Sequence, residues 1–279
     1  MTPGARPLIA LVTDFGARDH YVGTMKGAML AICADIALVD ITHEVPPHDI
    51  MAGAIELAAA YRHFPLGTTF LAVVDPGVGS ARRGLGAEAG GYRFVAPDNG
   101  VLSVVFEETP PDRVVDLSNP RYARAEVSRT FEGRDRFGPA AVWLATGVDL
   151  GELGPAIHDW ARIDVPKART TGEGIEGAVV RVDRFGNLVT NIERSVLEAA
   201  GPVGRLSVRV GDDKDDKDDR DDSGGTPLAI VGTYGDVAAG EPCALVGSTN
   251  HLEIAVNGAS AASRLGAARG ARVIVSRSP

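Results

Sequence analysis

The sequence is poor in aromatic residues and has no excess of positive charge. Phe, Trp and Tyr together make up 5% of its 279 residues, so it has little material for the aromatic platforms on which unpaired bases stack. Its formal net charge of −9 repels polyanions. The composition argues against nucleic acid as a partner, while 44% hydrophobic and 23% charged residues are ordinary for a globular protein.

Cysteines and long apolar runs are also scarce. The two cysteines, Cys33 and Cys243, lie far apart in apolar surroundings, which excludes a disulfide framework and favours buried structural roles. No apolar run approaches the roughly 20 residues of a membrane span. The apolar run 9–12 leads into Asp14 and does not fit a secretory signal, and the histidines show no metal-ligand spacing. We expect a cytoplasmic protein that binds neither a membrane nor a metal ion.

In the first part of the chain, apolar runs typical of buried strands alternate with segments of helical spacing. Expected strands cover residues 8–12, 37–41, 69–74, 93–96 and 114–116, and expected helices cover residues 21–33, 49–61 and 139–146. A strand–helix–strand order implies right-handed crossovers between parallel strands. We therefore predict an α/β N-terminal domain with a mostly parallel sheet over residues 1–168.

The second part of the chain consists of short apolar or alternating runs punctuated by Gly and Asn. These runs cover residues 177–183, 205–210, 228–232, 244–247 and 272–276. Such a pattern, with few helical segments, is typical of a small β-barrel or β-sandwich. We predict a smaller, all-β, barrel-like C-terminal domain over residues 169–279.

An acidic segment interrupts the predicted barrel. Residues 211–225 contain eight Asp against two Lys and one Arg. The segment has the composition of a cation or partner site, but repulsion between like charges opposes its packing. We favour a solvated, disordered insertion between two strands.

Polar residues follow the first three predicted strands. Asp14, His43 and Asp75 each stand at the carboxyl end of a strand, which is where open α/β sheets bind their ligands. Asp14 has the chemistry to accept hydrogen bonds from both hydroxyls of a ribose, although it would also serve as the N-cap of the next helix. His43 and His48 flank two prolines, so we expect them to be loop or surface histidines and not metal ligands.

The segment that begins at Asp75 is the most informative. A carboxylate ends a strand, a Gly-rich turn lets the backbone pass close to a ligand, and Arg82 and Arg83 follow. The turn lacks the Gly-Lys-Ser/Thr ending of a P-loop and the glycine spacing of a dinucleotide site. Spacing alone is equally compatible with a structural ion pair between Asp75 and an arginine.

Two polar segments of the predicted barrel suit a zwitterionic amino acid. Asp183 and Glu253 supply carboxylates for an ammonium group, whereas Ser248 and Thr249 supply hydroxyls, beside backbone amides, for a carboxylate. The same residue types also build ordinary turns. The spacing leaves both interpretations open.

Seven segments, taken in order over nearly the whole chain, resemble the S-adenosyl-L-methionine (SAM) hydroxide adenosyltransferase family, the adenosine-forming SAM hydrolases related to the fluorinase and chlorinase. They are Leu11-Val-Thr-Asp-Phe-Gly, Val39-Asp-Ile-Thr-His-Glu-Val-Pro-Pro, Val74-Asp-Pro-Gly-Val-Gly-Ser, Ala96-Pro-Asp-Asn-Gly, Phe131-Glu-Gly-Arg-Asp, Asp183-Arg-Phe-Gly-Asn and Leu252-Glu-Ile-Ala-Val-Asn. The specificity lies in the ordered set. The resemblance implies an α/β domain, a β-barrel domain and a homotrimer that binds SAM between subunits.

The resemblance also implies roles for individual residues. The positions that would activate water match Asp75 and Arg82, and the halide-using relatives lack this pair, so water is favoured over chloride or fluoride. The residues that would contact the substrate are Asp14 at the ribose hydroxyls, Asn187 and the backbone near Gly258 at the adenine, and Asp183, Ser248 and Thr249 at the methionine part.

One active-site position departs from the family. The family has a His in a Phe-His-Gly-Arg-Asp pattern where this chain has Glu132. A carboxylate at this position is able to orient the water or Arg82, or to act as the base itself. A slower enzyme, an altered nucleophile and an engineered substitution are equally compatible with the sequence.

The expected function is hydrolysis of SAM to adenosine and L-methionine, by in-line attack of an activated water at C5′. SAM is then the substrate, and no cofactor is expected. Two alternatives remain: a SAM- or adenosine-binding module that lost activity with Glu132, and a halide adenosyltransferase.

Overall fold

The computed structural model describes residues 6–172, 174–211 and 227–277. The chain divides into two compact units, Met1–Val165 and Pro166–Pro279, which we call the N-terminal unit and the barrel unit. Apart from its first residue, the acidic segment 211–225 lies outside the described residues. Within the described ranges, no helix combines the length and the apolar character needed to cross a bilayer.

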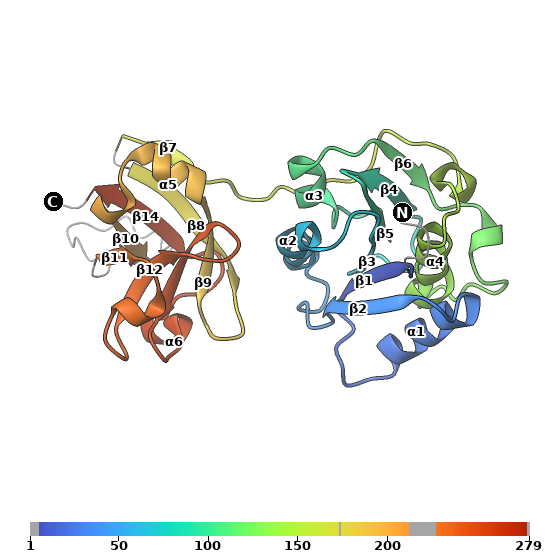
Figure 1. Cartoon of the computed structure of the whole chain (residues 1–279), viewed down its shortest axis with the longest axis horizontal. Coiled ribbons are helices and arrows are strands. Elements are labelled where there is room, and N and C mark those ends of the chain that lie inside the picture. The colour runs from blue at the N-terminus through green and yellow to red at the C-terminus, as the bar shows by residue number, and fades with distance from the viewer. Residues whose placement is uncertain (1–5, 173, 212–226, 278–279) are drawn as a thin grey trace. The chain divides into compact units, whose positions relative to one another are not determined.

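A six-stranded mixed sheet forms the centre of the N-terminal unit, in the order β2-β1-β3-β5-β4-β6 (Figure 1). β2, β1, β3 and β5 run parallel to one another, whereas β4 runs antiparallel to both β5 and β6. The predicted α/β domain with a mostly parallel sheet is confirmed. The strands are Leu8–Thr13 (β1), Ala37–Thr42 (β2), Thr69–Val73 (β3), Gly84–Ala89 (β4), Tyr92–Pro97 (β5) and Arg113–Asp116 (β6).

Helices cover both faces of this sheet. Successive residues of a strand point to opposite faces, so Ile9 and Leu11 of β1 pack in one apolar cluster, and Ala10 and Val12 pack in another. The first cluster includes residues of α1 and α4, and the second includes residues of α2 and α3. The helices are Tyr21–Ile32 (α1), Ile50–Ala60 (α2), Ser103–Glu108 (α3) and Gly138–Ala145 (α4), the last directly preceded by a π-helical turn, Gly133–Phe137 (η3).

The barrel unit is a closed seven-stranded barrel. Its strand order is β14-β10-β11-β12-β13-β9-β8, and pairing between β14 and β8 closes it, with β7 added beside β8 (Figure 1). The predicted all-β, barrel-like domain is confirmed. The elements are Arg169–Thr171 (β7), Gly174–Val182 (β8), Leu188–Glu193 (β9), Arg194–Ala200 (α5), Leu206–Gly211 (β10), Leu228–Val231 (β11), Pro242–Val246 (β12), His251–Val256 (β13), Ala261–Leu265 (α6) and Arg272–Arg277 (β14).

Closure of the barrel depends on a glycine. Gly174 begins β8 at φ +143, a conformation that other residues rarely adopt, and a Cβ on it would overlap the carbonyl oxygen of Val275 in β14. Only hydrogen fits where the two strands meet. The interior is mainly apolar, and Ile175, Leu252 and Val273 are among its fully buried side chains.

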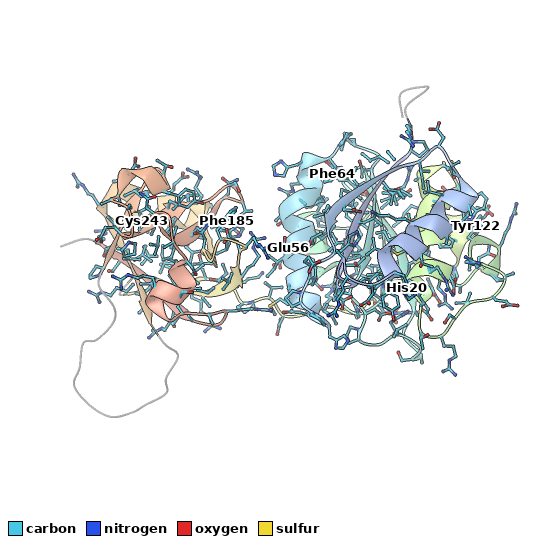
Figure 2. All side chains as sticks on the ribbon, turned by 90° about the horizontal axis from the view of Figure 1, so that it is seen from below. His20, Glu56, Phe64, Tyr122, Phe185 and Cys243 are labelled. Atoms are coloured by element: carbon cyan, nitrogen blue, oxygen red, sulfur yellow. The ribbon has the colours of Figure 1, made fainter. Side chains whose placement is uncertain are left out.

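Both cysteines are free thiols that pack against apolar side chains. Cys243 lies in β12, fully buried against Leu245 and Ala255 (Figure 2). Burial raises the pKa of the Cys243 thiol, which disfavours the reactive thiolate. Cys33 is partly buried at the end of α1 and packs against the core of the N-terminal unit.

Candidate active site

The carboxyl ends of three neighbouring strands gather the polar residues of the N-terminal unit. Asp14 follows β1, His43 follows β2 and Asp75 follows the end of β3. Because β2, β1 and β3 are adjacent and parallel, these ends lie along the same edge of the sheet. This is the edge at which open α/β sheets bind ligands.

Asp75 is paired with Arg82 by two hydrogen bonds. Arg82 Nε donates to Asp75 Oδ1 at 2.7 Å, and Arg82 Nη2 donates to Asp75 Oδ2. The Gly-rich turn makes this possible, because it doubles back at Gly79, which has φ +77. Asn99 Nδ2 donates to the carbonyl oxygen of Val74 at 2.8 Å and so holds the backbone just before Asp75.

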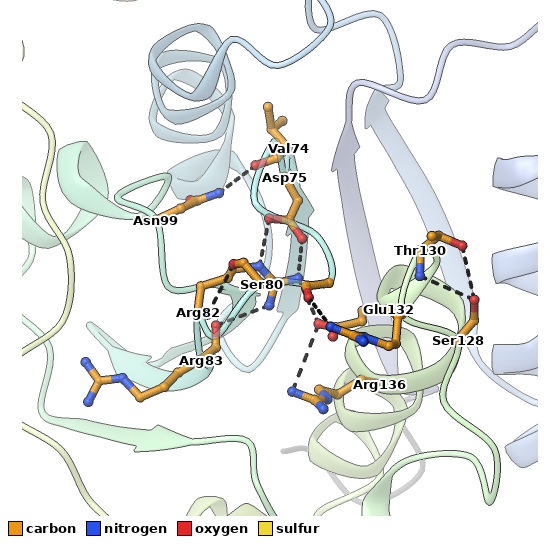
Figure 3. A network of polar contacts seen from close by, with 12 residues as sticks. Val74, Asp75, Ser80, Arg82, Arg83, Asn99, Ser128, Thr130, Glu132 and Arg136 are labelled. Atoms are coloured by element: carbon orange, nitrogen blue, oxygen red, sulfur yellow. Dashed lines mark hydrogen bonds and ion pairs between the residues drawn. The ribbon is translucent and has the colours of Figure 1, made fainter.

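Glu132 joins this pair through Arg82 Nη2, the nitrogen that also donates to Asp75. Arg82 Nη2 donates to Glu132 Oε2 at 2.7 Å, so one cation lies between two carboxylates (Figure 3). The side chains of Asp75, Arg82 and Glu132 are only 6%, 9% and 9% exposed. We call these three residues the Asp–Arg–Glu cluster. The spacing left open whether Arg82 pairs with Asp75, and the structure shows that it does.

The surroundings keep Arg82 charged. Burial acts to lower its pKa, but the hydrogen bonds and charges of Asp75 and Glu132 outweigh burial and raise the pKa of the guanidinium above its ordinary value. The Arg82 Cζ also lies 5.1 Å from the centre of the Phe137 ring, a favourable cation–π contact. The cluster therefore contains a permanently positive centre held in a fixed orientation.

Asp14 anchors a neighbouring loop and does not cap the next helix. Its Oδ2 accepts a hydrogen bond from the backbone N–H of His48 at 2.9 Å, whereas α1 begins at Tyr21 with His20 as the N-cap residue. His48 adopts φ +68, which is unusual for a residue other than glycine. The capping role considered for Asp14 is therefore wrong, and its Oδ1 has no hydrogen-bond partner among the residues that the structure describes.

His43 differs in part from the expectation. It does lie in a loop, but its side chain is buried, not on the surface. Its Nδ1 lies 2.8 Å from the Thr13 hydroxyl, and its Nε2 lies 3.0 Å from Asp40 Oδ1. The ring thus links the ends of β1 and β2 next to Asp14.

In the barrel unit, Asp183 and Asn187 form one compact turn between β8 and β9. Asp183 Oδ1 accepts hydrogen bonds from the backbone N–H groups of Phe185 and Asn187 at 2.9 and 2.8 Å, and Asn187 Nδ2 donates to Asp183 Oδ2 at 2.9 Å. The backbone N–H of Ala262 donates to the carbonyl oxygen of Gly186 at 2.9 Å. The turn therefore lies against the segment that follows β13, which contains Gly258.

Glu253 is a buried carboxylate in the middle of β13. It is 7% exposed, and the Tyr234 hydroxyl donates to its Oε1 at 2.7 Å. Burial is the main reason that the pKa of Glu253 is raised; the Tyr234 hydrogen bond opposes this rise, and the Asp183 charge adds to it. Burial and the Glu253 contact likewise raise the pKa of Tyr234. Glu253 is thus held by the Tyr234 phenol, and the positive charge of Arg181 also acts to lower its pKa.

Ser248 and Thr249 occupy the turn between β12 and β13. In the β13–β9 pairing His251 lies opposite Glu193, whereas Ile254 lies opposite Leu188. The turn with Asp183 and Asn187 directly precedes Leu188, so it lies beside the later part of β13, whereas the turn with Ser248 and Thr249 precedes the first residue of β13. Glu253 lies near both turns: the charge of Asp183 contributes to raising its pKa, and a Cβ on Gly247, directly before Ser248, would meet its Oε2.

Sequence reasoning missed several residues that shape these sites. Phe137 supports Arg82, Arg136 Nη1 lies 4.0 Å from Glu132 Oε2, and Tyr234 binds Glu253. Asn99 belongs to the Ala96-Pro-Asp-Asn-Gly segment, which could have suggested a role for it. Tyr234 carries no local signal, since it lies 19 residues from its partner.

Replacing Glu253 with Gln is expected to stabilise the barrel unit near neutral pH. The folded-state pKa of Glu253 lies above its ordinary value of 4.5, so between these two values the folded state binds more protons than the unfolded state. Wild-type stability therefore falls as pH rises through this window. Glutamine keeps an oxygen for the Tyr234 hydroxyl but does not ionise.

Thermal unfolding of wild type and Glu253→Gln from about pH 4 to pH 8 checks the expected stabilisation. The variant should have the higher Tm at neutral pH, with a gain that shrinks toward the acid end. The matched control is Glu176→Gln, at a half-exposed carboxylate that accepts from Arg272 Nε at 2.7 Å. A gain that does not vary with pH would contradict the explanation.

Comparison with known proteins identifies the family. The SAM hydroxide adenosyltransferase N-terminal domain matches residues 9–154, and the C-terminal domain of the same family matches residues 177–274. The chain belongs to the SAM hydroxide adenosyltransferase family. The family expected from the ordered segments is confirmed.

Individual members of the SAM hydroxide adenosyltransferase family and its relatives match over almost their full length. The chain is 39% identical to the (R)-S-adenosyl-L-methionine hydrolase of Salinispora tropica, over 96% of this chain and 97% of that protein. It is 38% identical to the protein of that name from Thermus thermophilus, with 95% and 97% covered. It is also 32% identical to a fluorinase of an Actinoplanes species, with 93% and 94% covered.

The fold of this chain also matches a solved structure. The crystal structure of an uncharacterized conserved protein from Thermotoga maritima superposes with a TM-score of 0.87 at 33% identity, covering 96% of this chain and 99% of that one. Glu132, which is expected from the sequence to depart from the family pattern, lies in the Asp–Arg–Glu cluster of this family member. Its carboxylate binds the same guanidinium as Asp75.

Proposed function

We propose that this chain hydrolyses SAM to adenosine and L-methionine. The observation that carries the proposal is the Asp–Arg–Glu cluster, a buried set of two carboxylates and one guanidinium at the ligand-binding edge of the sheet. Relatives named as SAM hydrolases, 39% and 38% identical over nearly the full chain, support it.

The chemistry suits such a cluster. SAM carries a sulfonium, so methionine leaves C5′ as a neutral thioether and requires no general acid. Water is a poor nucleophile, because it holds its proton tightly, with a pKa of about 15.7. A positioned carboxylate that accepts this proton as the C–O bond forms contributes roughly 10²–10⁴-fold. Arg82 fixes the carboxylates, and in-line placement of the water contributes further. The proposal requires no cofactor.

The remaining site residues would bind the substrate. Asp14 is proposed to accept hydrogen bonds from the ribose hydroxyls, in the manner of acidic residues in nucleotide-binding folds. The methionine part would be held by charge-assisted hydrogen bonds to a carboxylate for its ammonium and to donors for its carboxylate. The residues proposed for the adenine are Asn187 and the backbone near Gly258, and those proposed for the methionine are Asp183, Ser248, Thr249 and Glu253.

A homotrimer in the cytoplasm completes the proposal. The proposed contacts come from both the N-terminal unit and the barrel unit, which suits the arrangement implied by the family resemblance, with SAM bound between subunits. Light scattering should then give a mass near three times 29.1 kDa. Two free cysteines are compatible with a reducing compartment.

The test is to incubate the purified protein with SAM in halide-free buffer, with and without added chloride, and to identify products by chromatography and mass. Adenosine and methionine in equal amounts, independent of chloride, are expected. Chloride-dependent 5′-chloro-5′-deoxyadenosine would instead identify a halide adenosyltransferase. SAM that remains bound and intact would identify a binding module.

A further inference from the structure

We propose that Glu132, and not Asp75, accepts the proton of the attacking water. This inference rests on the proposed function and assigns the base within it. The Asp75–Arg82 pair then serves to position Glu132. The argument depends on which carboxylate oxygens the guanidinium occupies.

Arg82 engages both oxygens of Asp75. Its Nε and Nη2 atoms donate to Oδ1 and Oδ2 in the two parallel hydrogen bonds of a fork-to-fork pair. To accept a proton, Asp75 would give up part of this pair while its side chain is only 6% exposed. Breaking one side of a buried ion pair is costly, because the remaining charge is left without its partner.

Glu132 keeps one oxygen free of the guanidinium. Its Oε2 accepts from Arg82 Nη2 at 2.7 Å and lies 4.0 Å from Arg136 Nη1, whereas its Oε1 has no hydrogen-bond partner among the described residues. A carboxylate has about four acceptor positions, so Glu132 retains the greater unused capacity. The two carboxylates share Arg82 Nη2, and Figure 3 shows them approaching the guanidinium from different directions. Glu132 is therefore the carboxylate of the cluster that is free to bind and deprotonate a water.

The step balances with these residues alone. The water oxygen forms a bond to C5′, the C5′–S bond breaks, and its electron pair goes to sulfur, which becomes the neutral thioether of methionine. The water proton passes to Glu132 Oε1, and Glu132 later releases it to solvent. Asp75 and Arg82 remain a neutral ion pair throughout, and the positive charge of the sulfonium leaves as the released proton.

The charge of the cluster also favours water as the nucleophile. Two carboxylates surround one buried guanidinium, so the three residues together carry a negative charge before the reaction. A halide ion placed beside Glu132 would meet like charge in a partly desolvated site, which is unfavourable. A neutral water meets no such penalty.

The decisive experiment compares Glu132→Gln with Asp75→Asn. We expect Glu132→Gln to bind SAM within a few-fold of wild type by calorimetry, while kcat falls roughly 10²–10⁴-fold. Glutamine keeps an oxygen for Arg82, so the cluster should remain folded. Glu176→Gln, in the barrel unit, serves as the matched control and should keep wild-type turnover.

Chemical rescue separates a base from a positioning residue. In Glu132→Ala, added formate should occupy the vacated carboxylate position and raise kcat in a saturable manner. The same formate should not rescue Asp75→Ala, because that variant lacks the partner that orients Arg82. Circular dichroism checks that each variant is folded, and Glu132→Gln remains decisive if the alanine variant is not.

Two outcomes would overturn the inference. One is unchanged kcat in Glu132→Gln, and the other is formate rescue of Asp75→Ala without rescue of Glu132→Ala. Wild-type protein is assayed in parallel. If it releases no adenosine, the proposed function itself fails; if it does so while Glu132→Gln keeps full turnover, only the assignment of the base fails.

Discussion

Replacing Arg82 with methionine is expected to destabilise the N-terminal unit and to reduce turnover to background. Asp75 and Glu132 would each lose their guanidinium while their side chains remain at most 9% exposed. Removing one partner from a buried ion pair costs about 3–5 kcal/mol, because the remaining charge is neither solvated nor paired. Turnover should fail as well, since neither carboxylate would keep its orientation toward the substrate.

Thermal unfolding with SAM-turnover assays checks this. A loss of about 3–5 kcal/mol in the free energy of unfolding should lower Tm by roughly 6–20 °C, at 2–4 °C per kcal/mol for a unit of this length. The control is Arg113→Met, because Arg113 makes the same two-bond pair with Asp149, at 3.0 and 2.8 Å, on the surface. That variant should lose little stability and keep its activity. Equal Tm losses in both variants would contradict the importance assigned to the buried cluster.

Replacing Asp14 with alanine is expected to weaken SAM recognition by at least tenfold in kcat/KM. Hydrogen bonds to a charged group contribute about 1.5–3 kcal/mol each, which is roughly 10–150-fold per bond. In the structure, Asp14 Oδ2 already accepts a hydrogen bond from the backbone N–H of His48 at 2.9 Å. Asp14→Asn keeps an oxygen for His48 but loses the charge, so it should fall between wild type and Asp14→Ala.

Comparing two nucleosides, with and without ribose hydroxyls, tests whether Asp14 binds those hydroxyls. Wild-type protein should bind adenosine more tightly than 2′,3′-dideoxyadenosine, and Asp14→Ala should lose this preference because the hydroxyls no longer have an acceptor. A variant that merely loosens the loop at His48 would weaken both ligands equally. Calorimetry with the two nucleosides distinguishes these cases, and an unchanged preference in Asp14→Ala would refute ribose binding by Asp14.

Most strands with an evident apolar pattern were predicted, whereas β9 was missed despite such a pattern and β4 was missed because it lacks one. The sequence Gly84-Leu-Gly-Ala-Glu-Ala lacks the bulky residues typical of strands, and no strand was expected there. The structure explains its small residues: a Cβ on Gly84 would overlap Phe137, and one on Gly86 would press on Leu150 and Leu117. Packing against residues far along the chain selects these glycines, and local patterns do not reveal that constraint.

The expected helices of the N-terminal unit lie close to those observed, because their apolar spacing is local. In the barrel, no strand was expected at β13, because its first residues continue the polar segment that contains Ser248 and Thr249. The buried carboxylate of Glu253 also contradicts the usual pattern of a strand, and it is tolerated here through the hydroxyl of Tyr234. That pairing joins separate segments and could be seen only in three dimensions.

For the candidate site, the residue types were predictable but the geometry was not. The ordered segments indicated Asp75, Arg82 and Glu132, yet the spacing left their pairing open. Which carboxylate oxygens Arg82 occupies depends on the turn at Gly79 and on the π-helical turn that follows Glu132. The free Oε1 of Glu132, on which the assignment of the base depends, follows from that geometry.

The most direct test of the account is a single turnover of enzyme in excess over SAM, carried out in water labelled with oxygen-18. Direct attack of water at C5′ predicts that the 5′-hydroxyl of the adenosine carries the label from the first turnover. Attack by a carboxylate of the cluster would form an ester, and its hydrolysis would release adenosine with an unlabelled enzyme oxygen. Unlabelled adenosine, or no adenosine at all, would contradict the account.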